Sequence, residues 1–453
     1  MTAAARFAAH ALDTRFADLP SGAVQKAKLF ILDSLGVGIA GSSADGAEGL
    51  LQVAAGWGDP AAPVWGRAAR LSPPAAAFLN AWQMHNQEYD SLHEGAVVHA
   101  LATVLPAALA AAEMRGGASG AELITAVAVG VDIAACLGLA SRSGFRFFRP
   151  GTAGGFGATA AAARLLGLDK KDLAAAFAWQ LAQVSGTMQA HVEGSPILPV
   201  QLAFNARAAV HSCELARLGF AGASAVFEGP FGYLALFEDD TVLEPALDRL
   251  GRDWRIAEFS HKPFPAGRGT HGGIEGAMVL RARHGFSAAD VAAVEVSAPP
   301  LIARLVGRPP RSEAGASYAR LCGAWTIARV LQNGALDLAD FRGAALSDPA
   351  TQALAERVTV QADDNTAPNA LAPQRVVVRL RSGAEFAWSC ETMLANPARP
   401  LTIEQHLTKF RRCLDFAAVP LPRDGADRLI EAVDRLDALP DVRVLGTLLG
   451  SPA

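Results

Sequence analysis

The sequence predicts a mainly α-helical protein in which a large helical domain is interrupted by a smaller α+β domain. Up to about residue 250, Ala-rich segments place apolar residues at helical spacing, and no strand alternates with them. Alternating apolar and polar residues, which are typical of strands, occur only beyond Ile256. Helical spacing then returns near the C-terminus. We therefore predict a discontinuous helical domain, residues 1–255 and 394–453, around an α+β lid, residues 256–393.

The helices of the larger domain follow from periodicity and from their ends. Residues 21–41 have helical spacing and end in Gly. Residues 120–140 and 151–168 are apolar nearly all round, so they should be core helices. Thr402 with Gln405 forms a capping box, which predicts the start of a helix. Further helices are expected at residues 170–186, 202–219, 403–416 and 426–439.

The lid is expected to contain a small sheet and two helices. Residues 291–299 and 357–363 alternate apolar and polar side chains. Residues 375–391 read as two strands around Ser382-Gly383, which is a hairpin signal. Helices are predicted around 272–284 and 317–333.

Composition excludes several classes of function. The 453 residues are 51% hydrophobic and 19% charged, which indicates a compact soluble protein with a large core. A formal net charge of −4 with scattered Lys and Arg argues against binding of nucleic acid. The five cysteines form no C-x-x-C pair and fit a reducing cytoplasm. We expect no signal peptide and no membrane span.

Residues 85–99 are the first candidate site. They hold six Asp, Glu or His side chains, although the composition of the chain would place about two there. No Lys or Arg occurs from Leu71 to Met114, so buried acids here need cations from elsewhere in the fold. A solvated loop is the alternative. The histidine spacings of eight and six match no zinc motif, so we expect no metal. The six residues are His85, Glu88, Asp90, His93, Glu94 and His99.

Two other segments place cationic side chains before a predicted helix. Arg149 precedes a run of small residues that includes Thr152, and free N–H groups at a helix start attract anions. Close packing of helices through Gly is the alternative explanation of this run. Lys262, Arg268 and His271 lie on a Pro/Gly loop at the expected domain junction, where a carboxylate could bind. Exposed loop charges are the alternative there.

The order of the segments resembles the MmgE/PrpD family nearly end to end. The segments include KLFILDSLGVGIAG, GTAGGFGATAAAARLLGLD, KPFPAGRGTHGGIEGA, WTIARVLQNG and LTIEQHLTKF. That family includes 2-methylcitrate dehydratase, cis-aconitate decarboxylase and iminodisuccinate epimerase. The resemblance implies a helical domain with an α+β lid, an active site between them, and a homodimer. It also implies small di- or tricarboxylate substrates and no metal or organic cofactor.

The resemblance also assigns roles to residues. His85, Glu88 and Asp90 fall on the family's H-x-x-D-x-D-D loop, and His99 falls on a histidine in a T-H-P-S context. Lys262 matches the lysine of a K-P-Y-P segment. The implied catalytic residues are His99, Lys262, His271, Asp90 and His85, and the expected substrate-binding residues are Glu88, Arg149, Thr152, Gln201, Arg268 and Trp325. The chain departs from the family pattern where Phe148, Gln201, Phe204 and Trp325 stand in place of His, Lys, His and Tyr.

The resemblance implies a cofactor-independent lyase that removes a proton and eliminates a group beside a carboxylate, as 2-methylcitrate dehydratase does. An isomerase or epimerase and a decarboxylase of the same substrates are alternatives. All three need cations on the carboxylates and a group that exchanges protons near neutral pH, most simply His. A carboxylate-binding protein without turnover is the alternative of another class.

Overall fold

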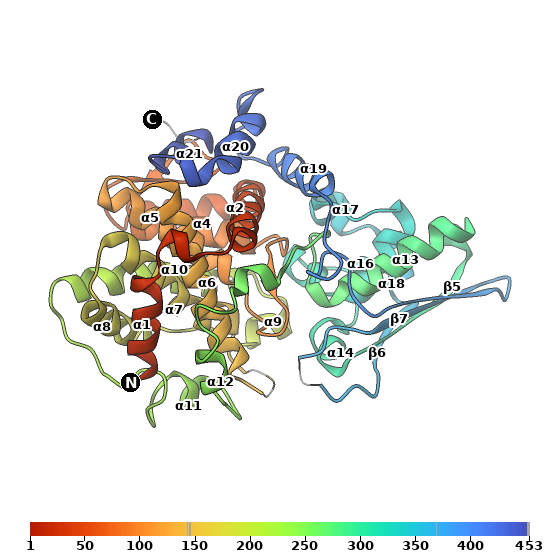
Figure 1. Ribbon diagram of the computed structural model, residues 1–453. Helices are drawn as coiled ribbons and strands as arrows, with labels where there is room; N and C mark the ends of the chain where they lie inside the picture. Colours follow the sequence, from red (N-terminus) through yellow and green to blue (C-terminus); the bar gives the residue numbers. More distant parts are fainter. Residues whose placement is uncertain (143, 145, 368, 451–453) are drawn as a thin grey trace.

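The computed structural model describes residues 1–142, 144, 146–367 and 369–450. Figure 1 shows a large group of helices and, at the right of the view, a smaller part that carries a mixed sheet. The predicted fold class, mainly α with a smaller α+β part, is confirmed. The helices of the larger part are α1 Ala3–Asp13, α2 Ser21–Gly41, α3 Ala47–Ala55, α4 Pro73–His85, α5 Ala100–Arg115, α6 Gly120–Leu139, α7 Arg149–Leu166, α8 Lys170–Leu181, α9 Gln189–Glu193, α10 Ile197–Arg217, α11 Tyr233–Phe237, α12 Glu244–Leu247, α19 Ile403–Leu414, α20 Gly425–Asp434 and α21 Arg443–Leu448.

Helix α7 lies at the centre of the larger part, in contact with α5, α6 and α10. Its glycines allow these helices to approach closely. A Cβ atom on Gly157 would lie 2.2 Å from the carbonyl oxygen of Gly130 in α6. A Cβ atom on Gly154 would lie 2.6 Å from Thr103 Oγ1 in α5. The sequence allowed two explanations of this run of small residues, close helix packing and anion binding. The short distances support close helix packing.

Helix α6 is long and apolar enough to cross a membrane by length and composition, which holds for no other helix of the described residues. However, 89% of its most apolar window is buried inside the fold, and α5 and α7 pack against it. Such burial is typical of the core helix of a globular protein.

A four-stranded sheet organises the smaller part. Its strands are β5 Val291–Ala298, β6 Val358–Ala362, β7 Gln374–Leu380 and β8 Glu385–Cys390, in the order β6-β5-β7-β8. Strands β5 and β6 are parallel, and the other pairs are antiparallel. The predicted hairpin turn is confirmed by Gly383, whose φ of +89° suits glycine. The helices of this part are α13 His271–His284, α14 Pro300–Val306, α15 Ala316–Arg320, α16 Gly323–Asn333, α17 Gly343–Leu346 and α18 Pro349–Ala355.

The helix expected over residues 317–333 is two helices, α15 and α16. The chain leaves the helical conformation at Leu321 and is extended at Cys322, where φ is −104° and ψ is 103°. The first 250 residues also contain short strands that the sequence did not predict, namely β1 Ala62–Pro63, β2 Arg70–Leu71 and β3 Leu92–His93.

The buried apolar side chains form two large clusters. The first runs from Ala3 to Phe259 and resumes at Phe410, and it also takes in Leu321. The second runs from Phe264 to Met393. The division into a helical domain of residues 1–255 and 394–453 and a lid of residues 256–393 stays a prediction, and Ile256 and Phe259 pack with the first cluster. The names helical domain and lid are kept for these two parts; residues 451–453 lie outside the described part of the chain.

The chain passes between the two parts twice. It enters the lid through β4 Phe259–Ser260, which pairs with β3. It returns at α19, where the predicted capping box of Thr402 and Gln405 is present. Figure 1 shows α19 between the lid and the remaining helices.

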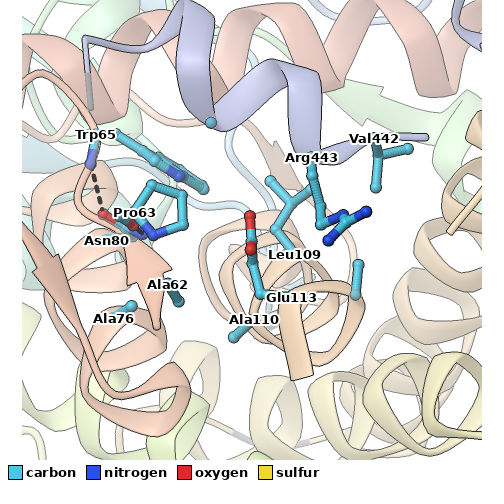
Figure 2. Close-up of a pocket in the computed structure, with 12 residues that line it drawn as sticks. Ala62, Pro63, Trp65, Ala76, Asn80, Leu109, Ala110, Glu113, Val442 and Arg443 are labelled. Carbon is cyan, nitrogen blue, oxygen red and sulfur yellow. Dashed lines mark hydrogen bonds between the residues drawn. The ribbon is translucent and has the colours of Figure 1, made fainter. Parts of the chain in front are cut away.

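The C-terminal helices close over the larger part. A hollow of about 20 Å³ between α4, α5 and α21 is shown in Figure 2. Asn80 bridges its wall, because its amide accepts from Trp65 N at 3.0 Å and donates to Pro63 O at 3.0 Å. This hollow lies among packed helices and contains none of the predicted site residues.

Candidate functional site

The loop that follows α4 folds into the protein, so its carboxylates and imidazoles are buried. Asp90 Oδ2 lies 2.9 Å from His85 Nδ1 and 3.0 Å from His99 Nδ1. An ionised carboxylate only accepts hydrogen bonds, so both Nδ1 atoms carry a proton. One carboxylate oxygen therefore orients both rings, and each Nε2 is left for other chemistry.

Lys262 supplies the buried cation that this loop lacks. Its ammonium nitrogen lies 2.7 Å from Glu88 Oε2 and 3.7 Å from Asp90 Oδ1, and its side chain has no exposed surface. Burial by itself raises the pKa of Glu88, but Lys262 and the two imidazoles outweigh it and lower that pKa to about 2. The same balance holds the pKa of Asp90 well below its ordinary value. Both carboxylates are therefore ionised.

The two histidines differ in their protonation. Burial lowers the pKa of His85, but the charges of Asp90 and Glu88 outweigh burial, so the net shift is upward. Burial also lowers the pKa of His99, and there Asp90 does not compensate, because Lys262 opposes it. His85 thus tends to hold a proton, while neutral His99 offers a lone pair on Nε2. Paired groups whose pKa values are pushed apart are suited to acid and base roles.

A cavity of about 70 Å³ lies beside the two imidazoles, between the loop, the helical domain and the lid. Two residues of its wall, Glu88 and Val97, have left-handed backbones with φ of +49° and +51°. Such strain in residues other than glycine concentrates at functional sites. The polar wall consists of His85, Glu88, His99, His191 and Arg268, and the apolar wall consists of Leu92, Val97, Phe148, Pro150, Met188, Leu198, Leu305, Val306, Leu321 and Leu371.

Of the two predicted arginines, only Arg268 reaches this cavity. It is buried against Glu94, with Nη2 2.7 Å from Glu94 Oε1. Arg149 was expected to supply a further cation, but the structure places it against another carboxylate, outside the cavity wall. Its guanidinium donates to both oxygens of Glu238, at 2.9 and 2.7 Å, and is fully buried there. This carboxylate already neutralises Arg149.

The remaining predicted residues lie outside the cavity wall. Thr152 is bonded to Tyr233 at 3.1 Å, and Gln201 is bonded to the backbone of residue 187. Trp325 lies in the lid core. His271 lies behind Arg268, with Nδ1 3.3 Å from its Nη1. Burial, together with Arg268, holds the pKa of His271 well below its ordinary value. The geometry gives these four residues packing or supporting positions.

Sequence reasoning missed the cavity residue His191 and Arg308, which lies outside the cavity wall and contacts His191. Arg308 Nη2 donates to the carbonyl of His191 at 2.7 Å and lies 3.2 Å from its Nδ1. Burial, and then Arg308, lower the pKa of His191 to about 4. Arg308 Nε and Nη1 are buried without a hydrogen-bond partner among the described residues. The segment GRPPR around Arg308 has the same Pro/Gly/Arg composition as the loop of Lys262, and this was the available signal.

The site could in principle hold a cation. His85, Asp90 and His99 each offer a ligand atom, and these atoms lie within 4.8 Å of one another. However, Asp90 Oδ2 already accepts hydrogen bonds from both Nδ1 atoms, and the raised pKa of His85 favours a proton on that ring. The donor set therefore favours proton transfer over metal binding.

Comparison with known proteins covers nearly the whole chain. The MmgE/PrpD N-terminal domain matches residues 5–246, and the MmgE/PrpD C-terminal domain matches residues 264–438. The chain is 28% identical to the cis-aconitate decarboxylase-like protein oryM of Aspergillus oryzae, over 95% of this chain and 94% of that protein. It is 26% identical to the cis-aconitate decarboxylases of Mus musculus and Homo sapiens, over 96% and 95% of this chain and 91% of each relative.

Proposed function

The chain belongs to the MmgE/PrpD family, and on this basis we propose that it is a cofactor-independent lyase that decarboxylates a small unsaturated tricarboxylate of the cis-aconitate type. The observation that carries the proposal is the His85–Asp90–His99 unit at the edge of a largely apolar cavity. The names of the relatives support decarboxylation over the dehydration that the sequence favoured.

The apolar wall suits the loss of carbon dioxide. The bond between the substrate carbon and its carboxylate breaks, the electron pair stays on carbon, and carbon dioxide leaves as a neutral, apolar molecule. The carbanion then needs one proton per turnover. His85, whose pKa is raised, supplies that proton. His99, which is neutral, then passes a proton back to the His85–Asp90–His99 unit. Asp90 keeps both rings in place.

The carboxylates that remain on the substrate need cations. Arg268 lines the cavity and Lys262 lies outside its wall in contact with Glu88, but each already has an acidic partner, Glu94 for Arg268 and Glu88 for Lys262. Arg308 has two buried nitrogens with no partner among the described residues. An unpaired buried donor costs free energy, and a carboxylate would satisfy it with charge-assisted hydrogen bonds. Arg308 is therefore the proposed binding group of the lid.

The test is a panel of carboxylates in D₂O followed by proton NMR. We expect cis-aconitate to lose carbon dioxide and gain one deuterium in the product, with His99→Gln as a slow control. Elimination from a hydroxy tricarboxylate without turnover of cis-aconitate would replace this proposal with a dehydratase. Inversion or exchange of a proton alone would indicate an isomerase. Thermal stabilisation by a carboxylate without any product would indicate a binding protein.

We further propose that the enzyme works as a homodimer in the cytoplasm. The five cysteines are all buried free thiols, which fits a reducing compartment. Light scattering after size-exclusion chromatography tests the dimer, and a mass of about 47 kDa would contradict it.

A further inference from the structure

A second group of buried titratable side chains lies where the chain passes between helical domain and lid. Asp33 comes from α2, His261 follows β4, and His406 lies on α19. Their ligand atoms all lie within 4.8 Å of one another. We propose that Asp33, His261 and His406 bind one divalent transition-metal ion of the zinc class, at a site separate from the proposed active site.

The polar atoms of this group lack partners. Asp33 Oδ2, His261 Nε2 and both ring nitrogens of His406 are buried without a hydrogen-bond partner among the described residues. The three residues are only 2%, 4% and 2% exposed. Buried polar atoms in native proteins nearly always have a partner, and orphaned ones point to an ion or ordered water. Each of the three residues therefore offers a buried ligand atom, and these three atoms lie within 4.8 Å of one another, which indicates a ligand.

The chemistry of the group suits a metal. Burial lowers the pKa of His261 to about 3, although Asp33 opposes the shift, and burial also lowers the pKa of His406. Both imidazoles are therefore neutral at pH 7, the form that binds metals. Two imidazoles and one carboxylate form a common zinc set with an open fourth position. Zinc distances of about 2.0–2.1 Å place ligand atoms about 3.3 Å apart, so atoms that lie within 4.8 Å of one another would close by at most about 1.5 Å on the ion.

Lys409 is the cation at this group, and its position is compatible with a metal. Its ammonium nitrogen lies 2.8 Å from Asp33 Oδ1 and donates to the carbonyl of Tyr89 at 2.9 Å. Oδ2 of Asp33 stays available. Carboxylates that bind a metal are often held in this way by a second hydrogen-bonded group. The His85–Asp90–His99 unit differs, because there one ring has a raised pKa.

The proposed metal site is reached from a surface groove and adjoins Lys262 in the chain. His406 lines a groove of about 570 Å³ between α2, α19 and α20, which gives an ion a route from solvent. His261 directly precedes Lys262, whose ammonium holds Glu88 in the proposed active site. A bound ion would link α2 to the two segments that connect the helical domain and the lid, namely the segment after β4 and α19. It would also fix the backbone next to Lys262.

The experiment measures metal binding by the full chain, freed of any tag and stripped with a chelator. We expect wild type to bind one equivalent of Zn²⁺ by calorimetry, with a higher Tm. His406→Phe keeps the ring but removes both nitrogens, so affinity should fall more than about 100-fold, beyond the loss seen for outer-shell changes. Asp33→Asn should weaken binding in the same direction. His99→Gln, which removes a ligand from the other group, should bind as wild type does.

A thiolate variant tests coordination directly. His406→Cys should still bind Co²⁺ and should show a thiolate-to-cobalt charge-transfer band that wild type lacks. The proposal is overturned if wild type binds no stoichiometric metal, which would assign ordered water to the site. It is also overturned if His406→Phe binds Zn²⁺ like wild type, or if His406→Cys shows no such band. None of these readouts involves turnover, so their failure leaves the proposed decarboxylation untouched.

Discussion

Replacing Asp90 with Asn removes the charge that both imidazoles share while it preserves the size of the side chain. The oxygen involved lies 2.9 Å from His85 Nδ1 and 3.0 Å from His99 Nδ1. Two unit charges about 3 Å apart attract by about 5 kcal/mol at an effective dielectric constant of about 20. One pKa unit corresponds to about 1.4 kcal/mol, so even a fraction of this attraction matters. We expect the pKa of His85 to fall in Asp90→Asn, because the charge and the hydrogen bond of Asp90 help to raise it.

The assay is kcat for loss of carbon dioxide from cis-aconitate as a function of pH. Positioned acid–base groups contribute about 10²–10⁴-fold to rate, so kcat should fall by a factor of this size. The protonated form of His85, whose pKa is raised, is present below that pKa and is lost as pH rises through it. The alkaline limb of the profile should therefore move to lower pH in the variant.

Asp132→Asn is the matched control. Asp132 is equally buried and is also bonded to an imidazole, His10, at 3.1 Å, but it lies in α6. This control should lose stability and retain kcat. Wild-type kcat with an unshifted profile in Asp90→Asn would refute the reasoning, and equal losses in both variants would indicate general destabilisation.

Four further predictions follow from the buried charges. Lys262→Met leaves Glu88 buried and unpaired, so the free energy of unfolding in denaturant should fall by about 3–5 kcal/mol. Adding Glu88→Gln to this variant should recover part of the loss, and no recovery would contradict the pairing. Arg149→Met should lower the free energy of unfolding by a similar amount, because it leaves Glu238 buried without its partner, and it should leave KM unchanged. A raised KM would instead indicate that Arg149 binds substrate. Glu88 has its pKa lowered from 4.5 to about 2, so the stability it contributes is fully present above pH 4.5 and is lost as pH falls towards 2. Glu88→Gln should flatten this acid limb in unfolding curves, and an unchanged limb would contradict it. Arg308→Ala should raise KM by about 10–100-fold, the equivalent of one hydrogen bond to a charged group, and an unchanged KM would exclude Arg308 from binding.

Much of the fold could be predicted because its signals are local. The capping box at Thr402 and the turn at Gly383 depend on residues a few positions apart, and both are present. The break at Leu321–Cys322 could not be predicted, because the local sequence continues in helical style. Leu321 packs with the core of the helical domain, a contact set by tertiary structure.

Some residues of the candidate site are marked by local sequence signals, whereas others depend on contacts that only the fold creates. The acidic loop and Lys262 are marked by composition and by Pro/Gly punctuation, and the structure brings them together. The pairing of Arg149 with Glu238 could not be predicted, because Glu238 lies 89 residues later in the chain. Arg308 and His191 were missed because they meet across 117 residues. Partner choice among buried charges depends on the three-dimensional fold, so a local pattern does not contain it.

The interruption of the helical domain also has a consequence for biosynthesis. Helix α2 is covered by α19 and α20, and α5 is covered by α21, yet these three helices are translated after the lid. At about 5–20 residues per second, the ribosome needs about 10–40 seconds to make residues 256–453. During that interval the nascent domain carries an uncovered apolar face. Chaperone demand should therefore peak while the lid is emerging, and chains that stall before α19 should be the ones that aggregate.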